Sequence, residues 1–151
     1  MTGLIVLVVT LAVVALFGAW RVLTDGRFRP RSAVRTTAPA EVEAAVQPAP
    51  SLLADTPFEA QLGDRATLVQ FSTAFCAPCR STRRILDEVT TLVPGVAHIE
   101  VDAEHHLELV RQLGIVRTPT TIVLDAAGSE HTRAVGAPTK AHVLAALADV
   151  V

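Results

Sequence analysis

Both cysteines of the chain lie in one short stretch, LVQFSTAFCAPCRSTRR, residues 68–84. Cys76 and Cys79 are separated only by Ala77 and Pro78, and no other cysteine occurs in the 151 residues. A disulfide across so small a loop would restrict the unfolded chain very little, so it cannot brace the fold. The spacing leaves two chemical uses open, a redox-active dithiol or half of a zinc site.

The residues around this pair predict a strand followed by a helix. Residues 66–73 are rich in apolar and β-branched side chains, which is typical of a buried strand. After residue 77 the apolar positions follow the spacing of an amphipathic helix, which Pro94 and Gly95 end. Cys76 therefore lies where a helix begins, and the partial positive charge there stabilises a thiolate. Arg80 adds positive charge near the thiolate, or it lies on a solvated helix face.

The remainder of the chain alternates predicted helices and strands. Helices are predicted at 56–62, 77–93, 105–113 and 138–151, and strands at 66–73, 96–103, 120–125 and 131–137. Thr56 and Glu59 have the spacing of a capping box for the first helix. Because helices and strands alternate early and two strands follow each other late, we expect parallel strands with an antiparallel edge. Residues 55–151 are therefore predicted to form an α/β domain with a central mixed sheet flanked by helices.

A separate constraint comes from the N-terminus, where no charged residue occurs between Thr2 and Trp20. A helix of this length reaches about 28 Å, close to the thickness of a bilayer core. A cleaved signal peptide would carry basic residues before the apolar run and a small-residue cleavage site after it. A buried core helix would need a polar face. We therefore predict one membrane-spanning helix over residues 2–20.

Residues 21–54 are predicted to form a basic juxtamembrane segment and a linker. Five arginines and one aspartate lie between residues 21 and 35, whereas residues 36–54 are rich in proline and alanine. Arginines beside a span favour the cytoplasmic side, so we expect a single-pass protein of the cell membrane with its domain in the cytoplasm. An extracytoplasmic domain is the alternative. Residues 36–151 are acidic and poor in aromatics, which does not favour a nucleic-acid partner.

The folded part resembles the thioredoxin family from about Leu52 to Val151. The sequence FCAPCR follows an apolar strand, where that family has Cys-Gly-Pro-Cys. Residues 101–124 resemble the family's run from its third strand to its cis-proline strand, and residues 133–147 resemble its closing glycine, lysine and final helix. The resemblance implies a thioredoxin fold and a membrane-anchored protein-disulfide reductase.

The resemblance also assigns roles to individual residues. Cys76 is expected to be the nucleophile and Cys79 the resolving thiol. Pro119 is expected to be a cis-proline facing the cysteines, and Thr118 to offer its backbone to an extended substrate strand. Phe75 and Pro78 are expected to lie beside this groove.

Partners follow from the same resemblance. Neither a metal nor an organic cofactor is expected, because a partner reductase supplies the electrons. If the domain faces the cytoplasm, that reductase is expected to be a flavin-dependent thioredoxin reductase. The resemblance thus implies a place in electron transport and in cell redox homeostasis, with disulfide-containing proteins as substrates.

Three positions depart from the family pattern. Ala77 replaces the usual glycine, and Phe75 replaces a tryptophan that could form a hydrogen bond. Gln70, six residues before Cys76, stands where many thioredoxins bury an aspartate that is thought to move a proton for the resolving thiol. Because glutamine cannot titrate, we expect a slower second step of the reaction.

Other functions must be weighed against this one. The five histidines show no ligand spacing that would complete a zinc site with the cysteines. An outward-facing oxidant or isomerase would use the same cysteines in the opposite direction. A non-catalytic thioredoxin-fold module for redox sensing or docking is the third alternative.

Overall fold

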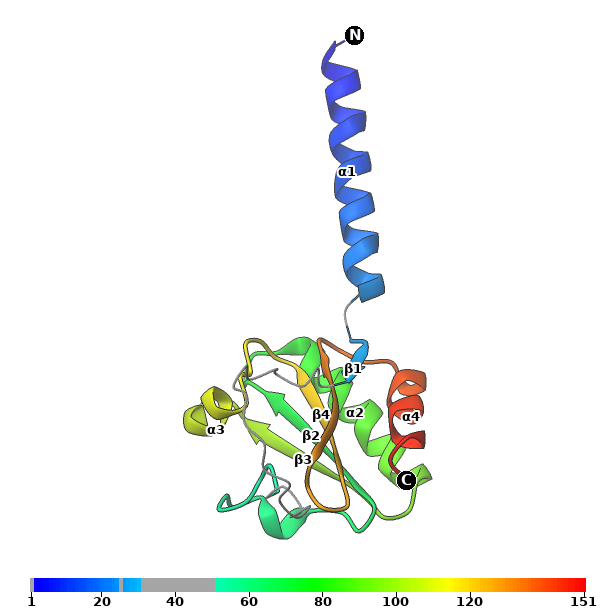
Figure 1. The fold of residues 1–151 in the computed structure, drawn as a ribbon. Coiled ribbons are helices and arrows are strands. Elements are labelled where there is room, and N and C mark those ends of the chain that lie inside the picture. The colour runs from blue at the N-terminus through cyan, green and yellow to red at the C-terminus, as the bar shows by residue number, and fades with distance from the viewer. Residues whose placement is uncertain (1, 25, 31–50) are drawn as a thin grey trace, which may run out of the picture.

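The computed structural model of the chain describes residues 2–24, 26–30 and 51–151 (Figure 1). Helix α1 stands apart from a domain in which a sheet lies between helices. The elements are α1 (Thr2–Thr24), β1 (Phe28–Pro30), the 3-10 helix η1 (Glu59–Gln61), β2 (Ala66–Ser72), α2 (Ala77–Leu92), β3 (Val96–Asp102), α3 (Leu107–Gln112), β4 (Thr120–Asp125), β5 (Glu130–Val135) and α4 (Lys140–Ala148).

The domain is built on a mixed sheet with the strand order β1-β5-β4-β2-β3. Strands β2 and β3 pair in parallel, and β4, β5 and β1 add antiparallel pairs. The mixed sheet with an antiparallel edge, predicted from the order of the elements, is therefore confirmed.

Each face of the sheet carries its own apolar core. On one face Leu68 of β2 packs with Leu86 of α2 and Val143 of α4. On the other face Phe71 of β2 packs with Leu109 of α3. Every residue of β2 is buried, and each large apolar side chain there contributes about 1.5–3 kcal/mol of burial energy. The strand that leads to the cysteines is thus the best-fixed element of the domain.

The first strand was not expected from the sequence. Residues 28–30 pair antiparallel with β5, with Phe28 opposite Ala134 and Pro30 opposite Thr132. Three residues are too few to show the alternation by which a strand is recognised. The strand forms because Phe28 packs against the core beside α4. Most of the predicted linker, residues 31–50, lies outside the described residues. Leu53 near its end is fully buried in the core.

Gly26 fixes the chain where it enters the domain. Its backbone has a φ of +73°, and its N–H donates to the carbonyl of Val135 at 2.9 Å. A Cβ at this position would lie 2.1 Å from the carbonyl oxygen of Ala137. Both the positive φ and this close approach require glycine.

The helix expected at residues 56–62 is shorter than predicted. Only η1, three residues long, is helical, and its N-cap residue is Phe58 rather than Thr56. The two side chains expected to form a capping box do cap N–H groups, but each accepts from the N–H one residue before the one expected. The Thr56 hydroxyl accepts from the N–H of Phe58 at 3.3 Å, and the Glu59 carboxylate accepts from the N–H of Asp55 at 3.1 Å.

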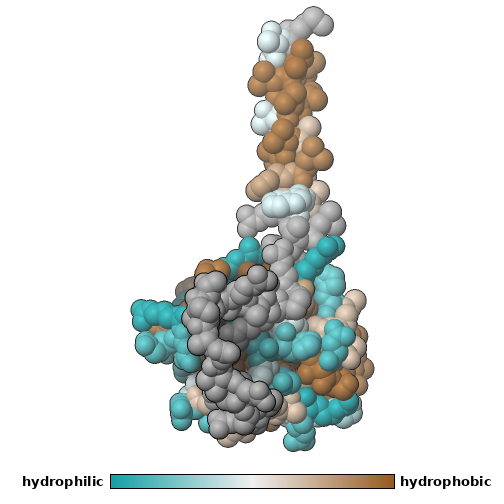
Figure 2. Space-filling model, viewed as in Figure 1, coloured by the Kyte–Doolittle hydropathy of each residue, from teal (hydrophilic) through white to brown (hydrophobic). Residues whose placement is uncertain are grey.

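Helix α1 contains an apolar segment, Thr2–Trp20, with a mean hydropathy of 2.6 and no burial against the domain (Figure 2). Its length and composition suffice to cross a membrane, and a signal sequence near an N-terminus has the same properties.

Replacing Gly26 by alanine tests the connection between α1 and the sheet. In Gly26→Ala, the strained backbone and the clash with Ala137 should cost roughly 1–3 kcal/mol and release β1 from β5. Amide hydrogen exchange across residues 26–30 should then be faster than in the wild type. Gly18→Ala is the matched control, because a Cβ there meets no atom within 4 Å. Unchanged exchange in Gly26→Ala would show that the connection does not depend on glycine.

Candidate functional site

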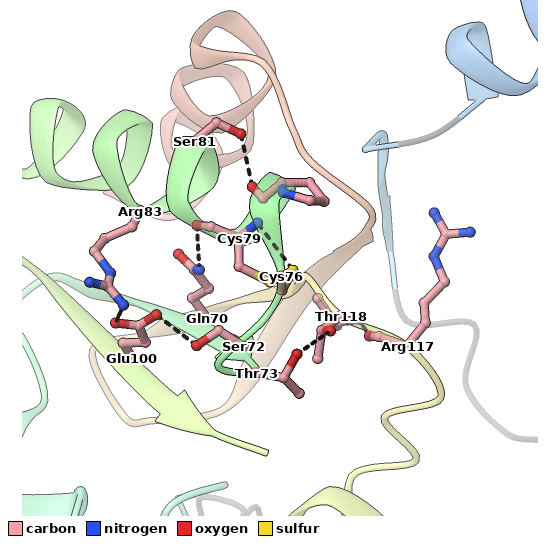
Figure 3. The surroundings of a disulfide bond; sticks show 12 residues. Gln70, Ser72, Thr73, Cys76, Cys79, Ser81, Arg83, Glu100, Arg117 and Thr118 are labelled. Atoms are coloured by element: carbon pink, nitrogen blue, oxygen red, sulfur yellow. Dashed lines mark hydrogen bonds and ion pairs between the residues drawn. A yellow bond between two sulfur atoms is a disulfide. The ribbon is translucent and has the colours of Figure 1, made fainter. Parts of the chain in front are cut away.

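The cysteine pair lies at the junction of β2 and α2, as predicted (Figure 3). Cys76 is the N-cap residue of α2, and its Sγ accepts a hydrogen bond from the N–H of Cys79 at 3.2 Å. Pro78 has no N–H, so the Cys79 amide is the one that serves the sulfur. Cys76 and Cys79 form a disulfide, with their Cα atoms 5.2 Å apart.

The two sulfurs have different surroundings. Cys76 is partly exposed, whereas Cys79 is only 2% exposed. The first turn of α2 contains no acidic residue, so the helix N-terminus stabilises negative charge at Cys76. When the pair is reduced, Cys76 can therefore act as an accessible thiolate and Cys79 as a sheltered thiol.

A cis peptide bond joins Thr118 and Pro119, as the family resemblance implies. The pairing of Phe71 with Thr120 brings this bond to the end of β2. The Thr118 and Thr73 hydroxyls lie 3.5 Å apart, and Figure 3 shows Thr118 on the side of the disulfide. The carbonyl of Pro119 accepts from Gly136 N–H at 2.8 Å. The cis bond is thus fixed on one side by the residues after β2 and on the other by the residues after β5.

Exposed apolar side chains occur in the cysteine segment and in the loop before the cis-proline. Phe75 is 96% exposed, and Pro78 beside it is also exposed. Val116, which the sequence reasoning did not single out, is 87% exposed in the loop before Thr118. The sequence could have indicated it, because Val116 is an apolar residue in the loop between Gly114 and the cis-proline and belongs to no predicted helix or strand. These side chains offer an apolar contact surface beside a reactive sulfur.

Gln70 lies directly beneath the cysteines and is fully buried. Its Nε2 donates to the carbonyl of Cys79 at 3.0 Å, while its Oε1 has no hydrogen-bond partner among the described residues. Its register partner Thr121 and Thr82 of α2 also have buried hydroxyls, and the described part of the chain offers neither of them a hydrogen-bond partner. The space behind Cys79 is therefore polar, but none of these three side chains titrates.

The arginines of α2 differ in their contacts. Arg83 pairs with Glu100 of β3, and Glu100 also accepts from the Ser72 hydroxyl at 2.6 Å. The hydrogen bond to Glu100 raises the pKa of Arg83, and Figure 3 shows its guanidinium beside Glu100 rather than at the disulfide. Arg80 is exposed and forms no ion pair in the described part of the chain. It remains a candidate for tuning the charge at Cys76.

Ion pairs also hold the segments around the site. Arg133 of β5 donates to Glu130 at 2.6 Å and to the carbonyl of Leu113 at 2.9 Å. The bond to Glu130 raises the pKa of Arg133. At the end of β3, a hydrogen bond from His105 lowers the pKa of Asp102. The contact to Leu113 fixes the start of the loop that leads to the cis-proline.

Within residues 2–24, 26–30 and 51–151, no three His, Cys, Asp or Glu side chains gather as metal ligands would. His98 contacts Asp87 at 2.7 Å, and His105 contacts Asp102 at 2.9 Å.

Comparison with known proteins gives a consistent result. The family model described as Thioredoxin matches residues 49–149. The chain is 36% identical over 72 residues to human "Thioredoxin domain-containing protein 2", covering 46% of this chain but only 13% of that protein. It is 31% identical over 100 residues to a thioredoxin of Alicyclobacillus acidocaldarius, covering 65% of this chain and 94% of that one.

Among solved structures, thioredoxin from Fasciola hepatica superposes with a TM-score of 0.54 at 21% identity. The superposition covers 62% of this chain and 88% of that one. At this identity the likeness concerns the fold.

The different surroundings of the sulfurs predict different reactivity after reduction. Cys76, studied in Cys79→Ser, should be alkylated with a pH midpoint below about 8.5, the value for an ordinary cysteine. Cys79, studied in Cys76→Ser, should react more slowly because it is buried. Iodoacetamide labelling followed by mass spectrometry measures both rates. Faster labelling of Cys79 would contradict this assignment.

Proposed function

The chain belongs to the thioredoxin family, and from that premise we propose that it is a protein-disulfide reductase that works through Cys76 and Cys79. The observation that carries the proposal is the position of Cys76. It is partly exposed at the N-terminus of α2, is bonded to a buried Cys79, and lies beside a cis-proline. These features support one attacking and one resolving sulfur.

The proposed reaction transfers two electrons from the dithiol to a substrate disulfide. The Cys76 thiolate attacks one substrate sulfur, forming a mixed disulfide and releasing the other sulfur as a thiolate that takes up a proton. Cys79 then loses its proton and attacks the Sγ of Cys76. This step forms the Cys76–Cys79 disulfide that the structure contains and releases the first substrate sulfur as a thiol.

The substrate is proposed to lie across the cis-proline loop. An extended segment would pair with the backbone at Thr118, as an added strand pairs with a sheet edge. Phe75 and Pro78 would contact it on the side of α2, because both are exposed there. Pro119 would hold this loop in place beside the sulfur.

Residues outside the domain are proposed to tether it. Residues 2–20 would form one membrane span, residues 21–54 a basic juxtamembrane segment and linker from which β1 and Leu53 join the domain, and residues 55–151 the rest of the catalytic domain. The arginines after the span favour the cytoplasmic side. On that side a flavin-dependent thioredoxin reductase would regenerate the dithiol, so that electrons pass from the reductase through this protein to disulfide substrates.

The reductase activity is tested with the full-length protein in detergent micelles. Wild-type protein should accelerate the reduction of insulin by dithiothreitol, because the regenerated dithiol turns over. Cys76→Ser should lower the part of the rate that depends on the protein at least about a hundredfold. Ser81→Ala, which removes an exposed hydroxyl of α2, is the matched control. If Cys76→Ser were as active as the wild type, or the wild type were inactive, the proposal would be wrong.

Gln70 predicts which step is slow. The three buried polar side chains behind Cys79, those of Gln70, Thr82 and Thr121, cannot accept its proton. Deprotonation of Cys79 should therefore limit release of the product. Gln70→Asp should release a preformed mixed disulfide at least about tenfold faster. Stopped-flow measurement of substrate release gives this rate, and Gln70→Asn controls for the change in volume. Equal rates in Gln70→Asp and wild type would exclude this role for the position.

A further inference from the structure

The disulfide and the end of α1 lie at the same end of the sheet, where β2 and β5 finish and β4 and β1 begin. This end is called the active-site edge below. Strand β2 runs toward Cys76, and β4 begins beside its end, with Thr120 opposite Phe71. Strand β5 ends at this edge, with Val135 opposite Thr120. Strand β1 begins there too, because Phe28 lies opposite Ala134. The chain therefore enters the domain at the edge that carries the active site.

Hydrogen bonds tie the entry point to the cis-proline. The N–H of Gly26 donates to Val135, and the next residue along, Gly136, donates to the carbonyl of Pro119. Gly26 is buried against Ala137. The connection is thus a packed part of the active-site edge.

The connection to the membrane span is short. From Trp20, where the apolar segment ends, α1 continues to Thr24 and rises by about 6 Å. From Thr24 to Gly26 the chain can extend by at most about 7 Å. The headgroup layer on each side of a bilayer is about 5–8 Å thick. Gly26 must therefore lie close to the outer surface of the headgroups.

The disulfide lies close to this entry point. Along the strands the register places Gly26 level with the end of β2, at about Ser72, four residues before Cys76. Across the sheet, β1 and β2 are three strand spacings apart, or about 15 Å. Figure 1 shows α1 joining the domain on the side where β4 begins. The active-site edge therefore faces the membrane.

The side chains at this edge suit a partner at the membrane surface. Phe75 and Val116 are exposed and apolar, and Arg27 and Arg80 are exposed cations. Two acidic residues of this edge, Asp102 and Glu104, lie at and just after the end of β3, the strand next to β2 and on the far side of it from β1. Toward the entry point of the chain, this edge thus offers exposed apolar side chains and cations, whereas its acidic residues lie on the β3 side.

We propose that the substrate is a disulfide held at the bilayer surface, in the juxtamembrane part of another membrane protein. The inference rests on the reductase activity and the membrane span proposed above. A soluble disulfide protein would have to enter the narrow gap between the domain and the headgroups. A juxtamembrane disulfide already lies at the height of Cys76.

Two membrane-bound probe peptides test this substrate class. Both carry the same two-cysteine disulfide loop, one directly after a transmembrane helix and one after about 40 flexible Gly and Ser residues. Pre-reduced full-length protein in lipid vesicles should reduce the near probe at least about tenfold faster than the far probe in a single turnover. Equal rates, or faster reduction of the far probe, would overturn the proposal.

A lengthened connection provides the matched variant. About 12 Gly and Ser residues inserted after Thr24 would allow the domain to move roughly 19 Å from the bilayer. The ratio of near to far rates should then fall to within about twofold. The same residues added after Val151 should leave the ratio unchanged. If the insertion after Thr24 left the preference intact, the short connection would not be its cause.

A measurement without substrate tests the orientation by itself. In a Trp20→Phe background, Phe75→Trp places a reporter just before the start of α2 and Leu92→Trp places one at its last residue, both at exposed apolar positions. Lipids with a nitroxide headgroup should quench Trp fluorescence more strongly in Phe75→Trp. Equal quenching, or stronger quenching in Leu92→Trp, would overturn the orientation.

The outcomes separate this inference from the proposed activity. If neither probe is reduced and insulin in micelles is not reduced either, the reductase activity itself is wrong. If insulin is reduced but the probes are reduced equally, only the substrate class is wrong. Quenching in Phe75→Trp together with equal probe rates would make this edge a lipid-contacting surface and would likewise overturn the proposal.

Discussion

The site depends on the burial of β2, which places Cys76 where α2 begins. Every residue of this strand is packed between two apolar cores, so the position of its last residue is fixed on both faces. The helix that follows offers the N–H of Cys79 to the sulfur of Cys76. Burial of Cys79 and exposure of Cys76 follow from the same geometry. The chemical difference between two identical side chains thus comes from where the strand ends.

The sequence predicted the parts of this arrangement that repeat along the chain. The apolar residues of β2, the stripe of α2 and the alternation of strands and helices all have a period, so the mixed sheet and the place of Cys76 followed from them. The cis bond before Pro119 followed from the family resemblance. Strand β1 could not be predicted, because three residues have no period and Gly26 shows its role only beside Ala137. The exposure of Val116 beside the cis-proline could not be predicted either, because a single apolar residue in a loop forms no repeating pattern.

Two residues, Gln70 and Gly26, determine the surroundings of Cys79 and the connection of the domain to α1. Gln70 fills the buried position behind Cys79 with an amide, which holds the Cys79 carbonyl but cannot exchange a proton at neutral pH. Gly26 joins the sheet to the helix that precedes it, at the edge that carries the disulfide. In the proposals above, the first residue limits how fast a substrate leaves and the second limits which substrates can reach the cysteines. Gln70 acts through its bond to the Cys79 carbonyl, and Gly26 through its packing against Ala137.

The central claim is that Cys76 attacks and Cys79 resolves. The most direct measurement uses full-length Cys79→Ser in lipid vesicles, mixed with the near probe and mapped by mass spectrometry after proteolysis. The account predicts a stable disulfide between Cys76 and one probe cysteine, with none formed by the matched Cys76→Ser variant. An adduct on Cys79 in Cys76→Ser, or no adduct on Cys76 in Cys79→Ser, would contradict it.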